Sequence, residues 1–161
     1  MQIDKIINNF KRLYKNYSED NFINQFIESF EFYPKNTLSR LKGDRNLSKK
    51  NNELIWKDKI YFVNCKNINT DIHLLANKLK KDGAILKNKI RFLIVTNFDL
   101  FLSIDIKTNQ SLECKLFEIH KFVDFFLPLI GIEKFQNIEE SPADIKASNN
   151  MGKLYDQILE D

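Results

Sequence analysis

The chain has 161 residues and a formal net charge of +3; 43% of its residues are hydrophobic and 29% are charged. This length is enough for one domain with a buried core, and the 14 phenylalanines exclude an intrinsically disordered chain. No apolar run is long enough to span a membrane, no continuous apolar stretch typical of a signal peptide follows the first residues, and the two cysteines match no zinc or disulfide pattern. We therefore expect a cytoplasmic protein with no membrane partner.

The charge is unevenly distributed along the chain. Residues 1–91 hold 19 Lys and Arg against 10 Asp and Glu, whereas residues 92–161 hold 6 against 12. A basic first part is compatible with an anionic partner such as nucleic acid. Ordinary surface lysines explain the same counts, since lysine is abundant throughout this sequence.

Two helices and a loop are predicted before residue 53. Apolar residues at helical spacing predict an amphipathic helix over residues 3–16. A second helix is expected to be capped by Ser18 and stopped by Pro34. Residues 35–52 are polar and basic with little periodicity, so we expect a mobile loop there.

A hairpin and a crossover are predicted next. Strand-forming runs at 54–56 and 60–63 flank a short turn, which is typical of a hairpin. A helix beginning at Ile72 and ended by Gly83 leads to an apolar strand at 90–95. Strand, helix and strand in this order predict two parallel strands joined by a crossover.

The last predicted elements complete a single α/β (α+β) domain. Strands are expected at 100–106 and 112–117, followed by a helix over 118–130. We expect residues 1–132 to form a mixed central sheet flanked by helices, and residues 133–161 to form a linker and a C-terminal helix. The residues of the 118–130 helix expected to face inward are Phe122, Phe125, Phe126 and Leu129.

The end of the second hairpin strand is the sharpest candidate for chemistry. Apolar residues lead to Asn64, Cys65 and Lys66, and positions 64 and 66 point to the same side of a strand. A metal-dependent nuclease holds Mg²⁺ with a carboxylate at the first position and another on the preceding strand, where Glu53 lies, and uses the lysine to orient water. Asn64 carries an uncharged amide instead, and many buried strands end in a polar residue and a lysine for structural reasons alone.

Five stretches in the same order resemble one enzyme family. They are residues 18–27, 60–66, 76–83, 92–105 and 143–156. Together they resemble the N-terminal part of fused type IIG restriction–modification enzymes, in which a PD-(D/E)xK nuclease domain precedes an adenine-N6 DNA methyltransferase. The resemblance implies a restriction-endonuclease-like fold, Mg²⁺ as the cofactor of an active site, and double-stranded DNA as partner. It also implies a methyltransferase domain, either in the full-length chain or as a separate subunit.

The resemblance carries over to individual residues only in part. The family's lysine falls on Lys66 and its early glutamate on Glu19, so both are retained. The family's strand glutamate falls on Asn64. Its upstream aspartate falls at Asn52 or Glu53, of which only Glu53 could substitute as a metal ligand. The resemblance therefore implies a catalytic site formed by Lys66, Glu53, Asn64 and Glu19, with Glu53 and Asn64 nearest the metal.

The helix after the hairpin adds candidate DNA contacts. Lys78, Lys80 and Lys81 could touch phosphates, although a solvated helix face is an equal alternative. The family's glutamine and tyrosine in this helix fall on Lys78 and Asp82. His73 has no partner visible in the sequence, so we expect a structural or surface role for it.

Three functions are compatible with these observations. The first is Mg²⁺-dependent DNA cleavage that Asn64 impairs, unless Glu53, Glu19 or Asp71 repairs the site. The second is a catalytically inactive DNA-binding or scaffolding module for a methyltransferase, and the third is a protein-interaction domain unrelated to nucleic acid. The chain contains no methyltransferase motif and no Pro-Pro pair, so we expect it to be part of a longer or split protein.

Overall fold

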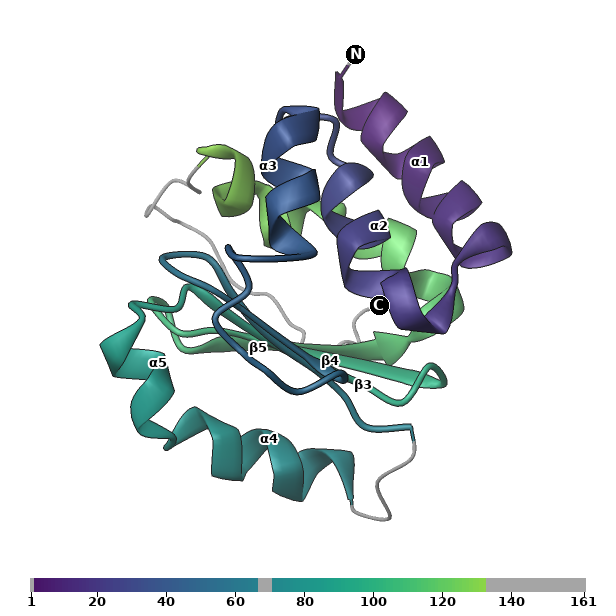
Figure 1. The fold of residues 1–161 in the computed structure, drawn as a ribbon. Coiled ribbons are helices and arrows are strands. Elements are labelled where there is room, and N and C mark those ends of the chain that lie inside the picture. Colours follow the sequence, from purple (N-terminus) through teal and green to yellow (C-terminus); the bar gives the residue numbers. More distant parts are fainter. Residues whose placement is uncertain (1, 67–70, 133–161) are drawn as a thin grey trace. The chain divides into compact units, whose positions relative to one another are not determined.

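The computed structural model describes residues 2–66 and 71–132, and Met1–Ile130 form one compact unit. A five-stranded sheet runs through this unit, with helices on both of its faces (Figure 1). This architecture confirms the predicted α/β class with a mixed sheet. The helices of the described ranges include none with the length and apolar character needed to cross a bilayer. The linker and helix expected over 133–161 lie outside the described residues.

The strands follow one another across the sheet in chain order. β1 and β2 form the predicted antiparallel hairpin, β2 and β3 are parallel, and β4 and β5 add two antiparallel strands. The parallel pair confirms the predicted crossover. The strands are β1 (Glu53–Trp56), β2 (Ile60–Asn64), β3 (Phe92–Thr96), β4 (Leu100–Asp105) and β5 (Gln110–Lys115).

The helices form two layers, one on each face of the sheet (Figure 1). What we call the first face is covered by α1 (Gln2–Asn16), the 3₁₀ turn η1 (Glu19–Asn21), α2 (Phe22–Glu28), α3 (Lys35–Leu41) and the 3₁₀ segment η2 (Leu116–Ile130). The second face is covered by the crossover helices α4 (Ile72–Lys80) and α5 (Gly83–Lys87).

Side chains alternate along the strands, so the sheet contributes residues to a hydrophobic cluster on each of its faces. Ile60 and Phe62 of β2 pack in the cluster of the first face, whereas Tyr61 and Val63 pack in that of the second. The first cluster is rich in aromatic rings, and fully buried Phe26 contacts several of them at its centre. Burial of one such side chain contributes roughly 1.5–3 kcal/mol.

The expected loop over residues 35–52 is wrong in its first part, because Lys35–Leu41 form α3. Pro34 precedes this helix with extended backbone angles, a position where its missing N–H costs nothing. Leu41 is buried and Leu38 is partly buried against the first core. Two apolar residues in a polar segment are too few to reveal a helical period, so the tertiary contacts decide the structure here.

Two predicted helix boundaries also need correction. Ser18 makes no side-chain cap, and a 3₁₀ turn precedes α2. Gly83 does not end a helix: α4 ends at Lys80, and Gly83 is the first residue of α5. The Asp82 carboxylate accepts a hydrogen bond from Ala84 N at 2.8 Å and so caps α5.

The helix expected over 118–130 is instead the longer 3₁₀ segment η2, with a kink at Phe122. The predicted inward residues Phe126 and Leu129 are buried, whereas Phe122 and Phe125 are only partly buried. The buried positions repeat every third residue on each side of the kink, as expected for three residues per turn, and the kink at Phe122 shifts the inner face by one residue, which explains the difference. The buried residues of this segment are Leu116, Ile119, Val123, Phe126, Leu129 and Ile130.

Candidate functional site

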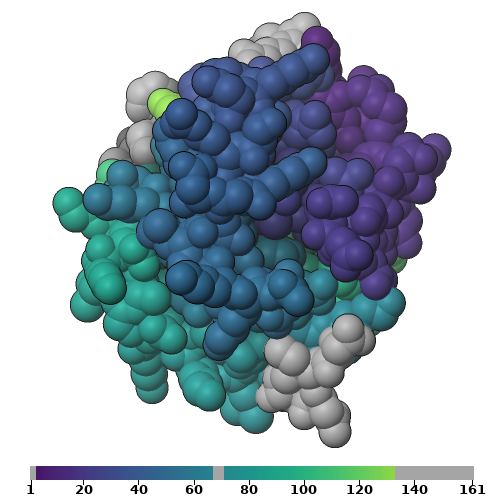
Figure 2. All heavy atoms as spheres, in the orientation of Figure 1, coloured from purple at the N-terminus to yellow at the C-terminus, as the bar shows by residue number. Residues whose placement is uncertain are grey.

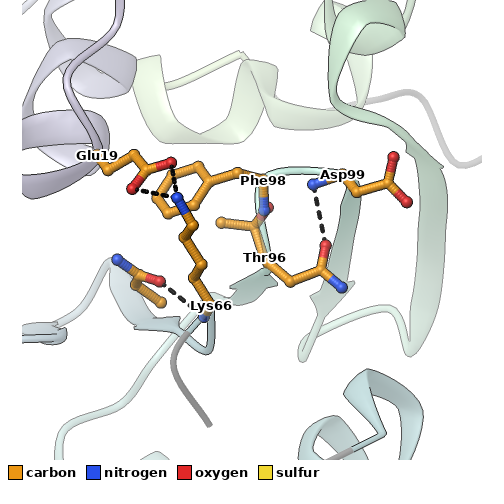
Figure 3. Close-up of polar contacts among 7 residues, drawn as sticks. Glu19, Lys66, Thr96, Phe98 and Asp99 are labelled. Atoms are coloured by element: carbon orange, nitrogen blue, oxygen red, sulfur yellow. Dashed lines mark hydrogen bonds and ion pairs between the residues drawn. The ribbon is translucent and has the colours of Figure 1, made fainter. Parts of the chain in front are cut away.

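Lys66 and Glu19 form an ion pair at one end of the sheet (Figure 3). The Lys66 Nζ lies 2.8 Å from Glu19 Oε1 and 2.6 Å from Oε2. Lys66 follows β2 and Glu19 begins η1, so the fold joins two predicted site residues 47 positions apart in the chain. Their side chains are 48% and 40% exposed, so the pair is accessible to a ligand.

The backbone around Lys66 is held at the end of the sheet. The Asn64 Oδ1 accepts a hydrogen bond from Lys66 N at 3.0 Å. The preceding residue, Cys65, donates its N–H to Thr96 O at 2.9 Å, which extends the β2–β3 pairing by one residue. The backbone of Lys66 is therefore held in place, and its side chain extends from there to the Glu19 carboxylate.

Aromatic rings support the ion pair from the side of the helices. Tyr17 stacks on Phe98 with ring centroids 5.5 Å apart, and Phe98 contacts Phe22 edge-on at 5.6 Å. Phe98 has a positive φ of 71° in the β3–β4 turn, where its N–H donates to Thr96 Oγ1 at 3.0 Å (Figure 3). Burial raises the pKa of Tyr17, and the charge of Glu19 raises it further.

A cleft of about 470 Å³ lies beside this pair. The start of α2, the end of α3 and the open end of the β1–β2 hairpin enclose it. In the space-filling view, the segment between α3 and β1 (blue) lies next to the first helices (purple) (Figure 2). Four residues considered above as site residues border the cleft: Glu19, Asn52, Glu53 and Asn64. Three lysines border it as well: Lys42, Lys49 and Lys50.

The structure does not bring the side chains of Glu53 and Asn64 together. Glu53 pairs with Val63, which packs on the second face, so the Glu53 side chain leaves the sheet on that face. Asn64 follows Val63, so its side chain lies on the first face, where Asn64 and Glu19 line the same cleft. The Glu53 carboxylate accepts a hydrogen bond from Ser48 Oγ at 3.0 Å and lies 3.7 Å from Lys50 Nζ.

Asn52 is the residue that lies against Asn64. The hairpin register, in which Glu53 pairs with Val63, places Asn52 directly opposite Asn64. Asn64 N donates to Asn52 O at 2.8 Å, and Asn52 Nδ2 donates to Asn64 O at 3.0 Å. The facing residues at the two strand ends are therefore two amides, and the neighbouring Glu53 projects from the other face of the sheet.

Residues 1–161 match the family model described as MmeI, N-terminal domain. The chain belongs to this family. DNA methyltransferase A of Bacillus subtilis (strain 168) is a relative with 37% identity over 124 residues, which are 76% of this chain and 14% of that protein. No solved structure matches the chain. The predicted resemblance to the N-terminal part of a fused restriction–modification enzyme is thereby confirmed.

The donors at the cleft of this MmeI N-terminal domain fit Mg²⁺ poorly. Mg²⁺ binds to one or two carboxylates with near-ideal octahedral geometry. Glu19 is paired with Lys66, the Glu53 carboxylate is engaged by Ser48 and Lys50, and Asn52 and Asn64 are uncharged. Over residues 2–66 and 71–132, no group of three or more His, Cys, Asp or Glu side chains is arranged to hold a metal ion.

The predicted DNA-contacting lysines lie away from the cleft of this MmeI N-terminal domain. Lys78, Lys80 and Lys81 are exposed at the C-terminal end of α4, on the second face of the sheet. The structure therefore does not bring them together with Lys66. The basic residues that do border the cleft, Lys42, Lys49 and Lys50, belong to the polar segment before β1, whose basic composition was their only sequence signal.

His73 has partners that only the fold reveals. Its Nε2 lies 2.7 Å from Glu113 Oε1 of β5, and its Nδ1 lies 3.3 Å from Asp71 Oδ1. The hydrogen bond that the His73 ring donates to Glu113 raises the pKa of His73 above its usual value. Asp71 caps α4 through the N–H groups of His73 and Leu74, so it is engaged on the second face, away from the cleft.

Proposed function

We propose that this domain is a restriction-endonuclease-like domain that contacts double-stranded DNA and in which Mg²⁺-dependent phosphodiester cleavage is impaired. The observation that carries the proposal is the strand end at the cleft. A lysine is retained there, whereas both facing positions, 52 and 64, carry amides.

Contact with DNA is supported by charge and position. The Lys66 side chain is half-exposed at the end of β2, and three further lysines border the adjacent cleft. Phosphate oxygens are the usual targets of such lysines in protein–DNA complexes. The MmeI family and a relative named as a DNA methyltransferase are consistent with DNA as the partner.

Impaired cleavage follows from the chemistry of the donors. A bound Mg²⁺ would activate water and neutralise charge on the phosphate. The amides of Asn52 and Asn64 bring no negative charge to offset the dehydration of a divalent ion. Mg²⁺-dependent cleavage by this domain should therefore be weak or absent.

A catalytically inactive scaffold for a methyltransferase is the second candidate. It is favoured by the relative's name and by the share of that relative, 14%, that this chain matches. In this case the domain would hold DNA for a methyltransferase, in the same polypeptide or as a separate subunit, in the cytoplasm. It differs from the first candidate only in having no residual cleavage.

Salt-dependent binding to a short DNA duplex tests the proposal. Because phosphate contacts release counterions, affinity should fall as salt rises. Lys66→Ala should weaken binding and lower the logarithmic salt slope by roughly one. Lys87→Ala, which removes a lysine of α5 on the second face, is the matched control and should change binding less. Binding that does not depend on salt, or the absence of binding, would contradict the proposal.

A further inference from the structure

We propose that the Glu19 carboxylate occupies the position of a DNA phosphate at Lys66, and that duplex DNA binds by displacing it. The inference rests on the proposed function and adds a regulatory contact to the same site. In the free protein Glu19 neutralises the charge of Lys66. Its negative charge also opposes the entry of DNA into the cleft.

The geometry of the pair is that of a bound anion. Two oxygens of one carboxylate lie 2.8 and 2.6 Å from a single ammonium nitrogen, both within charge-assisted hydrogen-bond range. A phosphodiester likewise offers two oxygens that share one negative charge. Among the described residues, Glu19 is the one carboxylate that forms an ion pair with this ammonium.

The two partners are held unequally. Lys66 is anchored through Asn64 Oδ1 and through the pairing of Cys65 with Thr96. Glu19 begins the short turn η1, which has no side-chain cap, and its side chain is 40% exposed. Rotation of the Glu19 side chain therefore separates the pair without any change in the sheet.

The energetics permit the exchange. Exposed ion pairs contribute little to stability because both charges remain solvated. A phosphate in a duplex adds the entropy of released counterions, which an internal carboxylate lacks. Glu19 lines the same cleft as Asn64 and Lys50. Its negative charge therefore repels the phosphate backbone of DNA that enters this cleft.

The test compares two variants that remove the same charge from the 161-residue chain. Glu19→Gln frees Lys66, whereas Glu28→Gln removes an exposed carboxylate at the end of α2, beside a different cavity. Fluorescence anisotropy of a labelled duplex without divalent ions measures Kd, and circular dichroism checks folding. We expect Glu19→Gln to tighten binding roughly two- to fivefold, the range that an exposed ion pair supports, and Glu28→Gln to tighten it less.

The Lys66→Ala background separates a specific contact from general charge. There, Glu19→Gln should lose most of its tightening effect. Equal tightening by both glutamine variants, or an undiminished effect in the Lys66→Ala background, would overturn the displacement proposal while leaving DNA binding intact. Absence of duplex binding by the wild type and by Glu19→Gln would overturn the proposed function and this inference together.

Discussion

Asn52 and Asn64 face each other at the open end of the β1–β2 hairpin, joined by hydrogen bonds of 2.8 and 3.0 Å. We propose that their amides stand where paired carboxylates would hold a divalent cation in an active nuclease. Glu53, one residue away, leaves the sheet on the other face. Under the proposed function, the domain keeps the lysine of a nuclease-like strand end and lacks the charges that bind a metal.

Two carboxylates introduced at these positions should create a divalent-cation site. The variant Asn52→Asp/Asn64→Asp places two negative charges on facing strand ends beside Lys66, where carboxylate oxygens suit Mg²⁺ and Mn²⁺. Because a ligand that binds only the folded state stabilises it, Tm should rise with Mn²⁺ concentration in this variant. Differential scanning fluorimetry measures the effect.

The matched control adds the same charge elsewhere. Asn8→Asp/Asn77→Asp changes two exposed residues, on α1 and on α4. We expect the wild type and this control to show little response to Mn²⁺. If the wild type responded as strongly as the cleft variant, the description of the cleft as a poor metal site would be wrong.

Asp105 should matter for stability because it is paired inside the protein. Its carboxylate accepts hydrogen bonds from Arg91 Nε at 2.8 Å and from Arg91 Nη2 at 3.1 Å, and the Asp105 side chain is only 6% exposed. Removing one charge of a buried pair costs about 3 kcal/mol, so Asp105→Asn should lower the free energy of unfolding by about that amount.

Asp99→Asn is the comparison within the same region of the chain. Asp99 pairs with Lys115 at 3.3 Å but is 73% exposed, so its loss should cost less than about 1 kcal/mol. Urea denaturation gives both values. Similar losses for the two variants would refute the structural role assigned to Asp105.

Tyr61, which is buried, and Tyr33, which is partly buried, should make the fold sensitive to alkali. Burial raises the pKa of Tyr33 and of Tyr61 to about 12, from an ordinary value of 10.0. Above pH 10 the unfolded chain releases phenolic protons that the folded chain keeps, so stability is present below pH 10 and is lost as pH rises toward 12. Between pH 10 and 11 each tyrosine should account for about 1 kcal/mol.

Urea midpoints at pH 9, 10 and 11 measure this loss. The Tyr33→Phe and Tyr61→Phe variants should each show a shallower decline than the wild type, since phenylalanine has no proton to release. A decline of unchanged steepness in the double variant would assign the alkaline sensitivity to other groups.

Local sequence patterns predict much of this fold. Alternating apolar runs on both sides of Lys57-Asp58-Lys59 indicate the hairpin, and the helical spacing between Ile72 and Leu79 indicates the crossover. These signals are strong because the buried faces of short elements repeat at a fixed period. In α3 only Leu38 and Leu41 pack against the core, so its period is not visible in the sequence.

The site was predictable only in part. The pairing of Lys66 with Glu19 agrees with the two residues that the family resemblance retained. The choice between Asn52 and Glu53 depends on strand register, where a shift of one residue reverses the face on which a side chain lies. Sequence spacing cannot set that register; the pairing of Glu53 with Val63 does.

The most direct test of the account is nicking of supercoiled plasmid DNA with Mg²⁺ or Mn²⁺, measured in parallel for the wild type and Lys66→Ala at concentrations where the wild type binds duplex DNA. We predict binding by the wild type with negligible nicking by either protein. Efficient nicking by the wild type that is lost in Lys66→Ala would contradict the account, because it would show that the amide-lined cleft supports cleavage.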